Sequence, residues 1–107
     1  MTDKELNEAI FKAKGWEFGR ISPHLNITAW RKVLPDGYID TEDYVPDYTH
    51  DWRLCGELLE EMGQSGEVEL SKYRDKWQVD IPHMPTVYAD TPQRAICEAW
   101  LAWKEGK

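Results

Sequence analysis

Six carboxylates lie close together within residues 35–52, a stretch that contains no Lys or Arg. They are Asp36, Asp40, Glu42, Asp43, Asp47 and Asp51. Clustered carboxylates are typical of cation sites, and Asp40, Glu42 and Asp43 are near enough in sequence to share a calcium ion. Their spacing lacks the alternating ligands, central Gly and closing Glu of an EF-hand loop. We therefore predict a solvated acidic loop without a metal ion.

The His and Cys residues give weaker grounds for a chemical site. His24, His50 and His83 are scattered, without HExxH spacing or adjacent Cys pairs, so no zinc site is expected. Cys55 and Cys97 stand among apolar residues of predicted helices. A nucleophilic thiol instead needs a neighbouring base and an exposed, electropositive setting. We interpret both cysteines as buried free thiols.

Acid–base catalysis has no support in the spacing of the carboxyl groups. Glu57 and Glu98 would act as acid or base only if a pocket raised the pKa of one of them. The chain also has no P-loop, no dinucleotide-binding glycine turn and no GxSxG nucleophile elbow. The sequence therefore predicts a protein that is not an enzyme and that uses no cofactor.

Binding is the remaining role for the acidic stretch, in which tyrosines accompany the carboxylates. The candidate partner-binding residues are Asp36, Asp40, Glu42, Asp43, Tyr44, Asp47 and Tyr48. Trp30 and Trp52 flank the stretch. Trp is a common anchor at protein interfaces, but a ring that fills the core or holds the loop down fits the same pattern. We favour the second interpretation for both rings.

The charge balance limits the class of partner. Thirteen basic and 20 acidic residues give the 107-residue chain a formal net charge of -7. Direct nucleic-acid binding is disfavoured, because such binding depends on Lys and Arg neutralising phosphates. No apolar run is long enough for a membrane span, so no membrane contact is expected. The length fits one domain, residues 1–107, acting as a monomer or a homodimer.

Three helices should position these residues. Thr2 and Glu5 have the spacing of a capping box, which marks a helix start. Thr49 is the expected N-cap of a second helix, and Thr91 with Pro92 opens a third, since Pro is favourable at the first helical position. The predicted helices span about residues 3–14, 50–63 and 92–105.

Shorter alternating segments predict strands. Apolar residues alternate with polar ones in residues 67–71 and 77–81, the pattern of an antiparallel hairpin with one buried face. Pro35-Asp36-Gly37 is a strong turn signal. Further extended pieces are expected at 16–19 with one buried face, at 27–33 as an edge strand, at 38–39 and at 86–89, while 40–50 should be a loop. The order predicts an α+β fold, a small mainly antiparallel sheet with three helices in α/β/α sandwich-like layers.

Five short motifs together resemble the phage ABA sandwich domain family. They are Gly15-Trp16 after the first helix, Pro35-Asp36-Gly37, the run from Pro46 to Asp51, Trp77 on a late strand, and Thr91 to Cys97 in the last helix. The resemblance implies a small phage or prophage protein in the cytoplasm of the bacterial host, with a sheet between helical layers. It supplies no catalytic residue.

Three hypotheses on function follow, and we favour the first. An acidic phage accessory protein would bind a host or phage protein with a basic surface, and anti-CRISPR-like inhibition of a host defence nuclease is its sharpest form. Alternatively, Trp and Tyr rings would line a pocket for a small ligand such as a nucleotide, rimmed by Arg53, Arg74 or Arg94. An enzyme is the least favoured. A competing explanation is that the negative charge only keeps the domain soluble.

Overall fold

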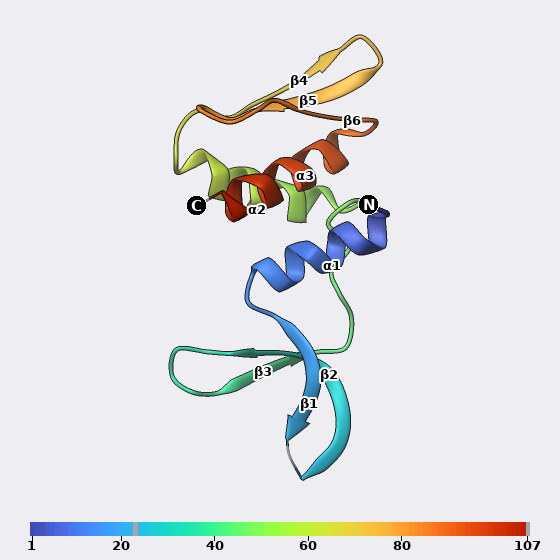
Figure 1. Cartoon of the computed structure of the whole chain (residues 1–107), viewed down its shortest axis with the longest axis vertical. Helices are drawn as coiled ribbons and strands as arrows, with labels where there is room; N and C mark the ends of the chain where they lie inside the picture. Colours follow the sequence, from blue (N-terminus) through green and yellow to red (C-terminus); the bar gives the residue numbers. More distant parts are fainter. Residues whose placement is uncertain (23, 107) are drawn as a thin grey trace.

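Figure 1 shows the computed structural model of the chain, which describes residues 1–22 and 24–106. The helices are α1 (Asp3–Ala13), α2 (Trp52–Gly63) and α3 (Pro92–Glu105). Sheet A contains β1 (Glu17–Ser22), β2 (Leu25–Val33) and β3 (Ile39–Glu42), and sheet B contains β4 (Glu69–Tyr73), β5 (Lys76–Asp80) and β6 (Val87–Ala89). All neighbouring strands are antiparallel. The predicted α+β class is confirmed, but the strands form two sheets instead of the single sheet expected, and the helices lie between the two sheets.

The hydrophobic core lies among the three helices, with α1 and α2 packed on α3 and α3 packed on β5 and β6 of sheet B. Its largest fully buried side chains are Trp100, Leu6, Ile10, Leu58, Met62, Ile96, Val79, Cys55 and Cys97. Burying each large apolar side chain stabilises the fold by about 1.5–3 kcal/mol. Cys55 and Cys97 are free thiols within this core, as predicted. The expected β4–β5 hairpin and the short strand β6 are also confirmed.

The helix starts follow the capping signals with one correction. Thr2 and Glu5 form the predicted capping box, and the Thr91 hydroxyl accepts a hydrogen bond from the Arg94 amide of α3. The N-cap of α2 is Asp51 and not Thr49, because the Asp51 carboxylate accepts from the first free amides of the helix. The prediction of Thr49 was wrong because Thr and Asp are both favourable N-cap residues, and Thr49 and Asp51 lie only two positions apart.

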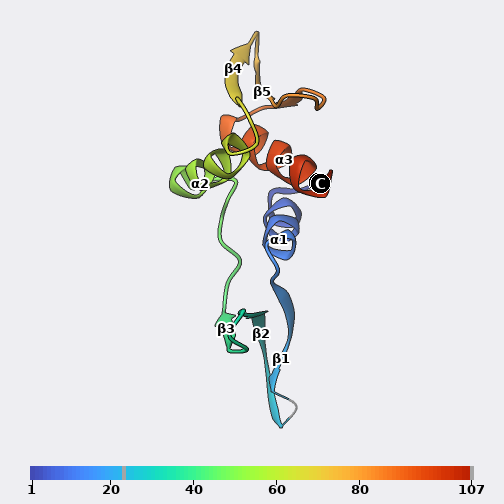
Figure 2. The ribbon, with the colours of Figure 1, turned by 90° about the vertical axis from the view of Figure 1, so that its left-hand side faces the viewer.

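Sheet A projects from the helices at one end of an elongated molecule of 54 × 26 × 21 Å (Figures 1 and 2). Its contact with α1 is aromatic: the Phe11 ring stacks on Trp16 at 4.7 Å and meets Trp30 edge-on at 5.2 Å. Phe18, which the alternation predicted on a buried face, is 60% exposed. That expectation was wrong because Phe18 lies beside the Trp30 ring, at 5.6 Å, and borders a surface hollow with Glu8 and Lys12 of α1 instead of packing under the helix.

The strand pairing also corrects two expectations. Strand β2 was predicted at an edge, but β1 and β3 pair with it on either side, so it is central. Strand β3 takes the first residues of the segment expected to be a loop. Among the described residues, no helix is both long and apolar enough to cross a bilayer.

Candidate functional site

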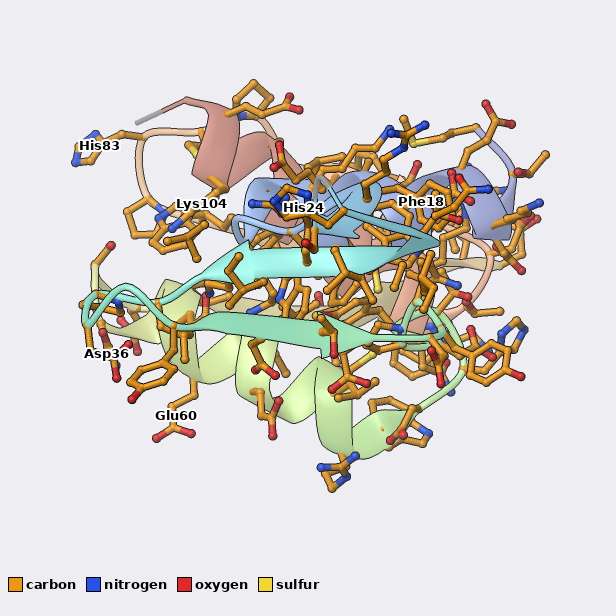
Figure 3. All side chains as sticks on the ribbon, turned by 90° about the horizontal axis from the view of Figure 1, so that it is seen from below. Phe18, His24, Asp36, Glu60, His83 and Lys104 are labelled. Atoms are coloured by element: carbon orange, nitrogen blue, oxygen red, sulfur yellow. The ribbon has the colours of Figure 1, made fainter. Side chains whose placement is uncertain are left out.

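The β2–β3 hairpin carries the first three candidate carboxylates. Its turn is closed by a hydrogen bond from the Leu34 amide to the Tyr38 carbonyl of 2.8 Å, and Gly37 supplies a positive φ of 90°. Asp36 accepts from the Tyr38 amide at 3.0 Å, so it stabilises the turn as well as charging it. Figure 3, viewed from the sheet A end, shows Asp36 at the outer end of the hairpin.

The register fixes the side of sheet A on which each residue of β3 lies. Asp40 stands opposite Lys32 and Glu42 opposite Trp30, and Trp30 packs on α1. Ile39, opposite Val33, therefore lies on the other face, because successive side chains of a strand alternate. All four residues of β3 are exposed.

Four exposed carboxylates follow one another along this hairpin and the residue after it. They are Asp36, Asp40, Glu42 and Asp43, and we call them the acidic edge. In the described part of the chain none of them forms an ion pair with Lys, Arg or His. Tyr44 comes next and is 83% exposed. Five of the seven predicted binding residues are thus exposed along this hairpin and the two residues after it.

Asp47, the sixth of them, is engaged within the protein. Its Oδ1 accepts hydrogen bonds from Asn7 and from the Thr49 hydroxyl, each at 3.0 Å, and lies 3.0 Å from His50 Nδ1. The hydrogen bond with His50 lowers the pKa of Asp47 and raises the pKa of His50. His50 Nε2 also lies 3.7 Å from Asp3 Oδ2. These contacts fasten the segment after β3 to α1.

Tyr48, the seventh, is buried at 4% exposure and packs in the core. Burial is the main cause that raises its pKa to about 12, and the nearby Glu57 and Glu61 add to it. A buried ring cannot contact a partner, so Tyr48 is no part of the candidate surface. Sequence reasoning placed it with Tyr44, because neither periodicity nor spacing separates the two rings in an aperiodic segment.

His50 is the functional candidate that sequence reasoning missed. It borders two hollows, one of about 430 Å³ with Lys4 and Tyr44 in its lining, and one of about 530 Å³ with Thr91 and Arg94 in its lining. The three histidines were judged scattered, although His50 follows Asp47 by three residues. That spacing was the available signal for the pair.

The arginines proposed to rim a ligand pocket do not converge. Arg53 pairs loosely with Glu57 on α2, Arg74 lies over the Tyr73 ring, and Arg94 binds Asp3 through Nη1 at 2.6 Å. Only the last of these three lines a hollow described above.

The flanking tryptophans differ in their environment. Trp30 is 8% exposed and packs between Phe11 and Phe18, as the core interpretation predicted. Trp52 is 54% exposed at the start of α2. Within the residues that the structure describes, no group of three or more His, Cys, Asp or Glu side chains is placed to hold a metal ion.

Comparison with family models, with curated proteins and with solved structures found no match to this chain. The resemblance to the phage ABA sandwich domain family stays a prediction.

Proposed function

We propose that this protein acts by binding another protein that carries a basic surface. The supporting observation is the acidic edge, four exposed carboxylates along a hairpin that projects from the helices. In the described chain none of these carboxylates forms an ion pair with Lys, Arg or His. Exposed charges of one sign steer a partner of opposite charge and set the orientation of the complex. Binding by charge and shape is therefore the role that this surface suits best.

The sharper form of the proposal is inhibition of a host defence nuclease, as anti-CRISPR proteins do. A nuclease holds nucleic acid in a groove of Lys and Arg side chains, and carboxylates along a narrow hairpin would occupy that groove in place of phosphates. The support is the charge separation on this chain and its resemblance to phage proteins. The chain itself would neither bind nucleic acid nor catalyse a reaction, and it would act in the cytoplasm of the infected bacterium.

A variant that neutralises the acidic edge tests this proposal. Asp36→Asn, Asp40→Asn, Glu42→Gln and Asp43→Asn together remove four charges and keep the oxygens that Asp36 and Asp40 use as acceptors. Displacement of fluorescent DNA from purified CRISPR effector nucleases is measured by anisotropy. We expect the native protein to displace the DNA. The variant should need a concentration at least about tenfold higher, which corresponds to a loss of about 1.4 kcal/mol of binding free energy.

The matched control removes four charges elsewhere. Glu60→Gln, Glu67→Gln, Glu69→Gln and Asp75→Asn lie on α2, on β4 and in the turns beside them, and all four side chains are exposed. This control should displace DNA as well as the native protein does. Equal losses of displacement in both variants would mean that only the net charge matters. Displacement by the acidic-edge variant at the native concentration would contradict the proposal.

A small-ligand role has one observation in its favour, the hollow of about 430 Å³ between α1 and the segment after β3. Its volume is in the range of ligand pockets, and Lys4, His50 and the Tyr44 ring would contact an aromatic ligand such as a nucleotide, although Glu8, Asp43 and Asp47 in the same lining oppose its negative charge. Under this alternative, nucleotides raise the melting temperature of the native protein and not of a Tyr44→Ala variant. The partner-binding proposal predicts no such rise.

A further inference from the structure

The outer edge of β3 is an open strand edge next to the acidic edge. Strand order β1-β2-β3 leaves β3 paired on one side, and no other described strand lies beyond it. The Leu34–Tyr38 hydrogen bond sets the phase of the ladder, because bonded pairs alternate in an antiparallel sheet. Asp40 and Glu42 therefore bond to β2, and the amide and carbonyl groups of Ile39 and Thr41 point outward.

The outward-pointing backbone groups of β3 find their hydrogen-bond partners in water and in one carboxylate. The Thr41 amide donates to the Asp40 side chain at 3.0 Å, and all four residues of β3 are exposed. An incoming strand can replace this carboxylate as the acceptor for the Thr41 amide, because the released carboxylate can then pair with a cation. An incoming strand that donates and accepts at Ile39 and Thr41 would extend sheet A by one strand.

The side chains of β3 define what that strand must carry. Asp40 and Glu42 lie on the face of Lys32 and Trp30, two positions apart, while Ile39 and Thr41 lie on the face of Val33. Cross-strand neighbours of opposite charge stabilise pairing, and like charges oppose it. A segment with basic residues at alternate positions and β-branched residues between them is complementary on both faces.

From this geometry we propose that the protein binds its partner by strand addition, with an extended basic segment of that partner pairing with the outer edge of β3. The inference rests on the proposed function and names its mode and its occupant. A second copy of this chain is a poor occupant, because Asp40 and Glu42 would then face acidic residues in a chain of net charge -7.

The other edge of sheet A is less suited to this role. The pairing of β1 with β2 shifts between Arg20 and Ser22, and such an irregularity bends an edge away from regular pairing. Arg20 would also repel a basic strand. The β2–β3 register is continuous over its four pairs.

Proline at position 41 provides the test on the protein side. Thr41→Pro removes an outward amide and keeps the bonds of β3 to β2, since Pro is tolerated where a strand amide points away from the sheet. Thr41→Val is the matched control, because it keeps the amide and removes only the hydroxyl. The probe is a short peptide in which Lys alternates with Val and Thr, titrated while amide hydrogen exchange is followed by NMR.

We expect the peptide to slow exchange at the Ile39 and Thr41 amides of the native protein. Thr41→Pro should weaken its binding about tenfold or more, and Thr41→Val should leave it near native. On the peptide side, N-methylation of alternate residues should abolish binding for one set of positions and spare it for the other, because only one edge of the peptide pairs. This arm does not depend on how the proline variant folds.

Three results would overturn strand addition. They are absence of peptide binding, equal binding to the Pro and Val variants, and equal effects of the two N-methylated peptides. None of them removes the proposed function, which the displacement assay with the acidic-edge variant tests separately. Loss in that assay together with equal binding to both position 41 variants would mean that the partner docks by charge without extending the sheet.

Discussion

Among individual residues, Asp47 and His50 have the clearest coupled roles, because they hold the segment after β3 on α1. The raised pKa of His50, caused first by its hydrogen bond with Asp47, means that the folded protein binds this proton more tightly than the unfolded chain. That stabilisation is complete below the ordinary His value of 6.5 and is lost as pH rises through the raised pKa. The lowered pKa of Asp47 acts in the opposite direction: its contribution is present above 3.8 and is lost as pH falls through the lowered value.

We therefore expect the free energy of unfolding to decrease as pH rises from about 6.5 through the raised pKa of His50, measured by urea titration at a series of pH values. His50→Gln should flatten this decrease, because Gln does not titrate. His24→Gln, which replaces another exposed histidine in the turn between β1 and β2, is the matched control. An unchanged slope in the His50 variant would show that the pair does not contribute to stability.

At the scale of elements, Glu61 of α2 joins the three helices. Its carboxylate accepts from Lys14, just after α1, at 2.8 Å and from the Trp100 indole of α3 at 2.9 Å. Burial acts to raise the pKa of Glu61, but the bonds from Lys14 and Trp100 outweigh it and lower the pKa overall. The indole ring is fully buried, so it has no alternative partner in water once this bond is lost.

Glu61→Ala should therefore destabilise the protein by about 1–3 kcal/mol, the cost of a buried donor left without an acceptor. Glu61→Gln keeps an acceptor for the indole and loses only a partly exposed ion pair, so its cost should be about 1 kcal/mol or less. Chemical denaturation of both variants measures the difference. Equal losses would assign the effect to the ion pair with Lys14, and no loss in either would contradict it.

Elements whose signals are local were predicted well from the sequence, and those that depend on distant partners were not. The capping box at Thr2 and the β4–β5 hairpin need only neighbouring residues, and both are confirmed. The central place of β2 depends on which segments pair with it, and the exposure of Phe18 depends on how closely α1 packs against sheet A. The candidate surface divides in the same way: Tyr44 and Tyr48 have similar local sequence, and only the tertiary fold buries the second.

At the scale of the whole molecule, sheet A and the core with sheet B should differ in stability. The core is built from α1, α2, α3 and sheet B, whereas sheet A is joined to it mainly by the Phe11 ring contacts and the Asp47 hydrogen bonds. A unit held by few buried contacts opens at lower free energy than the core. Strand β2 amides should therefore exchange through a local opening of low denaturant sensitivity, and α3 amides through global unfolding.

Two substitutions separate these openings. Phe11→Leu removes the ring contacts with Trp16 and Trp30 and should lower the opening free energy of β2 by about 1 kcal/mol. Ile96→Val, in the core of α3, should lower the global value by about 0.5–1.5 kcal/mol and leave the local opening of β2 unchanged, because the core stays packed when sheet A opens. Native-state hydrogen exchange measures both values. If each substitution lowered the opening free energies of β2 and α3 equally, the molecule would unfold as one cooperative unit. Sheet A would then meet a partner as a rigid extension of the core. Different shifts for β2 and α3 would mean that sheet A can adapt its edge to the strand that it receives.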